Sequence, residues 1–198
     1  GPFGHWEVQK TSWDAPIEPT SEEKARSYLE AHQRVVSEGE GKCLGTFAFY
    51  WGEKQECTAT WFGMFLSTGE FLGTIDAMTY AWSGSYPNNR SPQLQSLKSP
   101  AALKIITPGS PQTAQVEAAD PDGDKLNYRW IVVAESNDKK HGGDLERRPP
   151  SFPELIQSTN ANEVAFNAPE KSGAYRLFVY VTDNQNNAAT ANFPFYVN

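Results

Sequence analysis

The sequence has few of the residues that hold small proteins together by covalent or metal links. It contains two cysteines, Cys43 and Cys57, and three widely separated histidines in 198 residues. Two cysteines cannot define a disulfide framework, and neither residue type has the spacing of a zinc site. If residues 43–50 form one strand, Cys57 leaves from its far end. We therefore expect two free, buried thiols.

Long apolar runs and an excess of positive charge are also missing. No run approaches the roughly 20 residues that span a bilayer, and residues 1–20 lack the basic start and apolar core of a signal peptide. Lys and Arg number 17 against 24 Asp and Glu, for a net charge of −7. Because binding to nucleic acid phosphates needs clustered Lys and Arg, nucleic acid is disfavoured as the main partner. Neutral ligands such as sugars stay open.

Known cofactor and nucleophile motifs are absent as well. The glycines form no phosphate-cradling pattern after a strand, and the serines form no Gly-x-Ser-x-Gly elbow. We expect no cofactor.

The residues that are present predict a globular chain of two domains. The composition is 38% apolar and 13% aromatic, which is enough to bury a core. In the first half, a cap at Thr20 and apolar residues at helical spacing predict a helix that stops at Gly39. Residues 74–82 predict a second helix that closes at Gly84.

The most unusual stretch is CLGTFAFYWGEKQECTATWFGMFL, residues 43–66. Residues 43–50 are apolar almost without interruption, which predicts a strand buried on both faces, as in a parallel sheet covered by helices. Together with the first helix, this strand would make half of an α/β unit. The apolar run then breaks at Trp51 into the polar burst Glu53, Lys54, Gln55 and Glu56.

The second half has a different pattern. Residues 84–100 carry three prolines and many small polar residues, which is typical of a linker. From residue 101 onward, short alternating segments separated by Gly, Asn and Pro predict an all-β sandwich of about 100 residues. We expect Trp130 in its core, together with Phe193 and Phe195, and an exposed excursion at residues 136–153.

Two resemblances follow from these motifs. GPFGHWE at residues 1–7, the first helix and LGTFAFYWGEKQECTATWFGMF resemble the last part of a (β/α)8 barrel of the clan that includes family 2 glycoside hydrolases. DPDGDKLNYRW and SGAYRLFVYVTDNQNNAAT resemble an immunoglobulin-like module of the PKD or cadherin-like kind. The implied domains are a barrel end at 1–84, a linker at 85–100 and an immunoglobulin-like sandwich at 101–198.

The resemblance to glycosidases implies a carbohydrate site and an exported protein, whether secreted, periplasmic or at the cell surface. In such barrels the active site lies at the carboxyl ends of the strands, so the polar burst would reach its mouth. Trp51 would be the surface on which a sugar ring stacks, and Lys54, Gln55 and Glu56 would bind hydroxyl groups. The remaining residues implied to line this mouth or to hold a glycan are His5, Trp6 and Trp61.

The two catalytic carboxyl groups of such an enzyme would both lie before residue 1. Glu7 is a weak substitute nucleophile because it follows the glycines too late to match the motif. Glu53 and Glu56 are too close together on one loop to bracket a glycosidic bond. We therefore expect a chain that is inactive by itself, and a severed barrel end would expose strand edges that favour self-association.

Other interpretations stay open. The chain could be a self-contained carbohydrate-binding protein, or a surface interaction module with no small ligand. Asp120, Asp122 and Asp124 could form a calcium loop, but the loop lacks the glutamate expected at its twelfth position, so a turn between strands is favoured.

Overall fold

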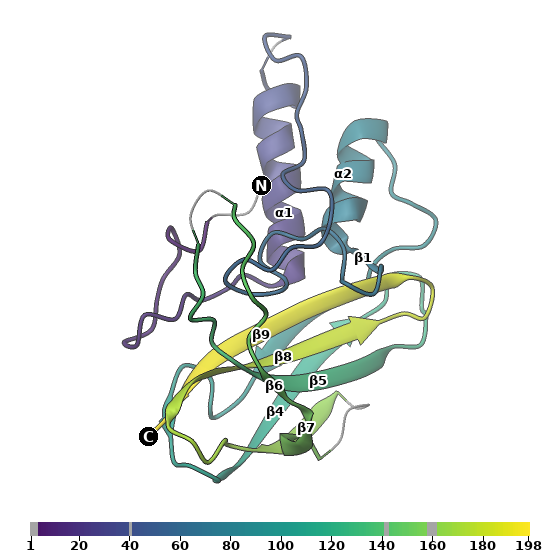
Figure 1. The fold of residues 1–198 in the computed structure, drawn as a ribbon. Helices are drawn as coiled ribbons and strands as arrows, with labels where there is room; N and C mark the ends of the chain where they lie inside the picture. Colours follow the sequence, from purple (N-terminus) through teal and green to yellow (C-terminus); the bar gives the residue numbers. More distant parts are fainter. Residues whose placement is uncertain (1–3, 40, 141–142, 158–161) are drawn as a thin grey trace.

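The computed structural model describes residues 4–39, 41–140, 143–157 and 162–198, so the first three residues of the GPFGHWE motif lie outside the described residues. The chain forms a β-sandwich covered on one side by helices and loops (Figure 1). One sheet has the order β1-β9-β8-β5-β6 with β3 also paired to β9, and the other has the order β2-β4-β7. The strands of the first sheet are β1 Phe71–Leu72, β3 Ile105–Ile106, β5 Asn127–Ala134, β6 Ser151–Phe152, β8 Gly173–Thr182 and β9 Asn187–Val197. Those of the second are β2 Gln93–Lys98, β4 Pro111–Ala119 and β7 Glu163–Asn167.

The sandwich core is built by alternate residues of the long strands. Trp130 and Val132 of β5 and Leu177 and Val179 of β8 face the second sheet and have at most 1% of their surface exposed. Because successive strand side chains point to opposite faces, the residues between them lie on the outer face of the larger sheet. Phe193 and Phe195 of β9 are also buried. The predicted β-sandwich and its core aromatics are therefore confirmed.

The predicted linker contains a strand. Residues 93–98 form β2, which pairs antiparallel with β4 at the edge of the smaller sheet. Apolar Leu94 enters the sandwich core. Composition alone concealed this strand because serine, lysine and glutamine occupy most of its positions.

Both predicted helices are present and their ends follow from the sequence. Helix α1 (Ser21–His32) begins at a capping box in which the Thr20 and Glu23 side chains accept each other's backbone N–H groups, and it continues as a π-helical turn, η1 (Gln33–Ser37). Helix α2 (Gly73–Ser83) ends at Gly84, whose φ of 79° is in the left-handed region that glycine favours. A short 3₁₀ helix, η2 (Pro153–Leu155), follows β6.

The N-terminal region forms a third layer on the sandwich. Both helices lie on the side of the larger sheet that faces away from β4 and β7 (Figure 1). The backbone N–H of Thr190 in β9 donates to the Ser21 hydroxyl at 2.9 Å, and β1 pairs in parallel with β9. Phe178, on the outer face of β8, is buried by this layer. Residues 1–84 are thus not held to the sandwich by a linker alone.

The prediction of a buried strand at residues 43–50 is wrong. These residues have no regular secondary structure, and Leu44 and Phe47 are fully exposed. A doubly buried strand needs a neighbour on each side and a covering layer on each face, and the described residues supply neither here. The larger sheet is mostly antiparallel, with two-residue parallel pairs at β1 and β3. The described residues therefore give no support for the end of a (β/α)8 barrel.

Candidate functional site

A cluster of exposed aromatic rings lies where the loop after residue 50 meets helix α2. Trp51 and Trp82 are stacked, with ring centroids 6.3 Å apart and planes 27° from parallel. Phe65 contacts Trp51 edge-on at 5.4 Å and contacts Phe71 at the same distance. Trp51 is 60% exposed and Trp82 is 52% exposed. We call Trp51, Phe65, Phe71 and Trp82 the aromatic surface.

The aromatic surface presents flat, polarisable ring faces to solvent. Large exposed aromatic groups are unusual on a surface that binds nothing, because aromatic rings contribute much of the binding energy at ligand sites and interfaces. A second pair of rings, Tyr80 of α2 and Tyr86 just after the helix, stacks at 4.5 Å and lines a groove of about 540 Å³ together with His32. The guanidinium of Arg90 lies 4.0 Å from the Tyr86 ring centroid.

The polar burst that follows Trp51 is mostly buried. Gln55 and Glu56 are 4% and 8% exposed, and Lys54 forms an ion pair with Glu56. Glu53 forms an ion pair with Arg148 of the 136–153 excursion. Neither Gln55 nor Glu56 therefore lies on the open face of the aromatic surface, where the resemblance to glycosidases would place hydroxyl-binding groups.

The described part of the 136–153 excursion contacts these polar residues and is not fully exposed. The Cys57 backbone N–H donates to Glu146 Oε2 at 2.7 Å, and Glu146 is 3% exposed. The polar residues after Trp51 thus join two loops that are about 90 residues apart in sequence. Burial raises the pKa of the Cys57 thiol to about 12, which leaves it unreactive at neutral pH. Both cysteines are free thiols, but the prediction that both are buried is wrong for Cys43, which lies in the irregular segment 43–50 and is partly exposed.

The remaining candidates near the N-terminus do not share one surface. His5 contacts both Trp6 and Trp61 edge-on, at 4.9 and 5.9 Å. Trp6 is 63% exposed, whereas Trp61 has no exposed surface and therefore packs inside the molecule in this structure. The Glu7 carboxylate accepts the Gly4 backbone N–H at 2.7 Å and closes a local turn. Burial lowers the pKa of His5.

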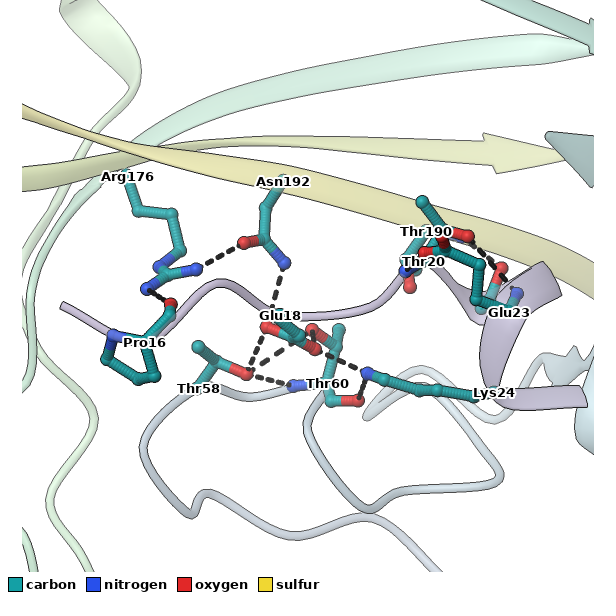
Figure 2. Close-up of polar contacts among 11 residues, drawn as sticks. Pro16, Glu18, Thr20, Glu23, Lys24, Thr58, Thr60, Arg176, Thr190 and Asn192 are labelled. Atoms are coloured by element: carbon teal, nitrogen blue, oxygen red, sulfur yellow. Dashed lines mark hydrogen bonds and ion pairs between the residues drawn. The ribbon is translucent and has the colours of Figure 1, made fainter. Parts of the chain in front are cut away.

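A buried polar network joins the N-terminal layer to the sandwich (Figure 2). Its centre is Glu18, whose two carboxylate oxygens accept four hydrogen bonds from separate parts of the chain. The donors are Lys24 Nζ at 2.5 Å, Thr58 Oγ1 at 2.7 Å, Thr60 Oγ1 at 2.8 Å and Asn192 Nδ2 at 2.8 Å. Burial opposes ionisation of Glu18, but the nearby Lys24 and Arg176 outweigh it and hold its pKa below the ordinary value. The carboxylate is therefore a structural anion.

Arg176 extends the network along the outer face of β8. Its guanidinium donates to the Pro16 carbonyl oxygen at 2.8 Å, to Glu135 Oε1 at 2.8 Å and to Asn192 Oδ1 at 2.5 Å. Burial raises the pKa of Glu135 against the pull of Arg176. Sequence reasoning missed Glu18, Lys24 and Arg176, because ordinary charged residues in helix and strand patterns give no signal of burial.

Residues 120–124 form the turn that the sequence favoured over a calcium loop, and two of their carboxylates meet a third acid. One oxygen each of Asp120, Asp124 and Asp183 lie within 4.8 Å of one another and could be ligands of a cation. Asp122 points elsewhere and accepts the Arg90 backbone N–H. Asp120 Oδ1 accepts the backbone N–H groups of residues 122 and 124, which fixes the turn. Asp183 lies too far along the chain for the sequence to have placed it here.

Comparisons with known proteins do not assign a family. No protein-family model and no curated protein matches the sequence. Among solved structures, a PKD domain of an M14-like peptidase from a Thermoplasmatales archaeon aligns with 55% of this chain and 97% of its own, at 18% identity and a TM-score of 0.33. The soluble domain of PmoD from a Methylocystis species aligns with 58% of this chain and 95% of its own, at 11% identity and a TM-score of 0.29. No helix in the described part of the chain is long and apolar enough to cross a membrane.

Proposed function

We propose that this chain is an accessory, immunoglobulin-like module of an exported carbohydrate-active protein, and that its aromatic surface binds carbohydrate. One observation carries the proposal: Trp51 and Trp82 stack on each other while each keeps more than half of its surface exposed. Fixed, exposed tryptophan rings suit the C–H faces of pyranose rings, and little conformational entropy is lost when the ligand binds.

The sandwich supplies the rigidity that such a surface needs. The helix that carries Trp82 begins directly after β1, which is paired with β9. Trp51 is fixed by its edge-on contact with Phe65, whose backbone bridges to Phe71 of β1. The rings are therefore tied to the sandwich through short connections, as expected for a preorganised binding surface.

The test compares polysaccharide binding by the natural chain with that of Trp51→Ala and Trp82→Ala. Affinity electrophoresis against a panel of soluble polysaccharides measures binding, and circular dichroism checks that each variant is folded. We expect each variant to lose at least about tenfold in affinity for the polysaccharide that binds the natural chain. Ile105→Ala is the matched control, because Ile105 is 60% exposed on the short strand β3.

Retention of full affinity by both tryptophan variants would contradict the proposal. Failure of the folded natural chain to bind any polysaccharide in the panel would also contradict it. Trp6→Ala provides a further comparison, since Trp6 is equally exposed but belongs to the N-terminal turn. Loss of binding in Trp6→Ala as well would extend the site to that turn.

A second candidate function is protein association through residues 44–51. Leu44 and Phe47 are fully exposed, and Phe49 and Trp51 are at least half exposed. Several exposed apolar side chains gathered on one irregular segment favour contact with another chain or domain. Sedimentation velocity over a wide concentration range tests this, with Phe47→Ser as the variant. Concentration-dependent association that Phe47→Ser abolishes is expected, whereas a monomer at every concentration would rule out self-association through this segment.

A further inference from the structure

A pocket of about 290 Å³ lies between the N-terminal layer and the outer face of the larger sheet. Its floor is formed by β5 and β8, and its roof is formed by the loops around residues 55–60 and 66–68. Ile131, Val133 and Phe178 supply an apolar floor. The pocket is separate from the aromatic surface, because none of the four rings of that surface lines it.

Two polar side chains that line the pocket are buried without a hydrogen-bond partner. Gln55 Nε2 and Ser136 Oγ find no partner among the described residues, although Gln55 is 4% exposed and Ser136 is 7% exposed. An unpaired buried polar group costs free energy and is rare in folded proteins. The amide nitrogen can only donate a hydrogen bond, whereas the hydroxyl can either donate or accept one. An acceptor is therefore the partner that satisfies both groups.

The charges around the pocket also favour an acceptor, and specifically an anion. Three arginines line it, Arg129, Arg148 and Arg176, against one acid, Glu135. Arg176 is already paired with Glu135, and Arg148 is paired with Glu53. Arg129 lies 4.1 Å from the centroid of the Tyr180 ring and carries the charge that no acid of the pocket lining balances. This positive site stands out in a chain of net charge −7.

We propose that this pocket binds a small organic carboxylate of about the size of a monosaccharide. The carboxylate accepts hydrogen bonds from Gln55 Nε2 and Ser136 Oγ, the arginines supply the compensating charge, and the carbon skeleton packs on the apolar floor. The volume is at the small end of the range for ligand sites, which excludes a polymer segment of several units. The proposal does not depend on carbohydrate binding at the aromatic surface.

The test uses ligand-observed NMR with small carboxylates and their matched uncharged counterparts. The probes are D-glucuronate with D-glucose, and benzoate with benzamide. We expect a saturable carboxylate signal that its uncharged counterpart does not give. The variants are Gln55→Leu, which removes the donor while filling similar space, and Ser136→Ala. Each should weaken carboxylate binding at least about tenfold.

Ser96→Ala is the matched control, because Ser96 lies on β2 and hydrogen-bonds to Glu117 away from the pocket. It should bind the carboxylate as the natural chain does. Gln55→Leu should remain folded with an unchanged or higher melting temperature, since it removes an unpaired buried polar group. Equal binding of charged and uncharged probes, or undiminished carboxylate binding by both pocket variants, would overturn the proposal. So would the absence of any carboxylate signal.

Discussion

The sandwich and the N-terminal layer that covers it are stabilised in different ways. The sandwich core is apolar, with Trp130, Val132, Leu177 and Val179 meeting side chains of the second sheet. The described residues of the N-terminal layer form only small apolar clusters, and the layer is joined to β8 and β9 by buried charges, chiefly Glu18 and Arg176. Apolar contacts do not depend on the precise orientation of the side chains. Buried charged groups, in contrast, are stabilising only when every hydrogen-bonding and charge partner is in place. The two regions should therefore respond differently to substitution.

The largest expected effect is in the sandwich core. Trp130→Ala removes a large side chain that is 1% exposed and should lower the free energy of unfolding by about 3–5 kcal/mol. Since the N-terminal layer packs on the same sheet, denaturant unfolding followed by far-UV circular dichroism and by tryptophan fluorescence should shift together. If the fluorescence transition of Trp130→Ala kept the denaturant midpoint of the natural chain, the N-terminal layer would not depend on the sandwich for its stability.

The second largest effect is expected when the buried network around Glu18 is broken. Glu18→Gln leaves the buried Lys24 ammonium without its anionic partner, so we expect a loss of about 3 kcal/mol in the stability of the N-terminal layer. The matched control is Glu117→Gln, which removes an exposed pair with Lys98 at 3.7 Å and should change stability by less than about 0.5 kcal/mol. Equal effects of the two substitutions would show that the network contributes no more than a surface pair.

The pH dependence of stability tests separately whether the Glu18 carboxylate stabilises the folded chain. The folded-state pKa of Glu18 lies below its ordinary value of 4.5. The stability that the ionised Glu18 carboxylate contributes to the folded state is therefore complete above pH 4.5. It is lost as the pH falls through the pKa of the folded state. The difference in unfolding free energy between the natural chain and Glu18→Gln should narrow as the pH drops from about 6 to about 3. A difference that stays constant or widens in acid would contradict the role of the carboxylate.

A smaller effect concerns the end of helix α2. Gly84 has a φ of 79° at the helix cap, so Gly84→Ala should cost about 1 kcal/mol through backbone strain. Thermal melting followed by circular dichroism measures the loss. Ser85→Ala, one residue beyond the cap, is the comparison and should cost less. A melting temperature for Gly84→Ala at or above that of the natural chain would contradict the assigned cap.

The smallest effect is expected at the aromatic surface. Trp51→Ala removes a side chain that is 60% exposed, so unfolding free energy should change by less than about 0.5 kcal/mol. Denaturant titration measures it. A loss above about 2 kcal/mol would mean that Trp51 serves folding, and its exposure at the surface would then no longer support a binding role.

The sandwich and the N-terminal layer also differ in how much of their structure the sequence predicts. The short segments of β-forming residues between turn residues specified the sandwich, and in β4 and β7 exposed and buried residues alternate as a local period-two pattern requires. The caps at Thr20 and Gly84 specified the helix ends for the same local reason. The apolar run at residues 43–50 led to a wrong prediction of a buried strand. The same residues can form a buried strand or an exposed irregular segment, and contacts with distant parts of the chain decide between the two.

The candidate site was predictable only in part. Trp51 is exposed as a sugar-binding role would require, but its partner Trp82 was interpreted as part of a helix and nothing more. The burial of this part of the chain could not be inferred, because its neighbours Glu53 and Cys57 bond to the 136–153 excursion about 90 residues away. The Glu18 network likewise joins residues separated by up to 174 positions, and no local pattern reports such pairings.

The most direct test of this account is native-state hydrogen exchange on the full chain, comparing the natural protein with Glu18→Gln. We predict that exchange of amides in α1 and in residues 55–66 accelerates strongly, while amides of β5 and β8 keep protection set by the apolar core. That result would show that buried charges hold the layer that presents the aromatic surface. Equal loss of protection in both regions, or no loss in either, would contradict the division on which the account rests.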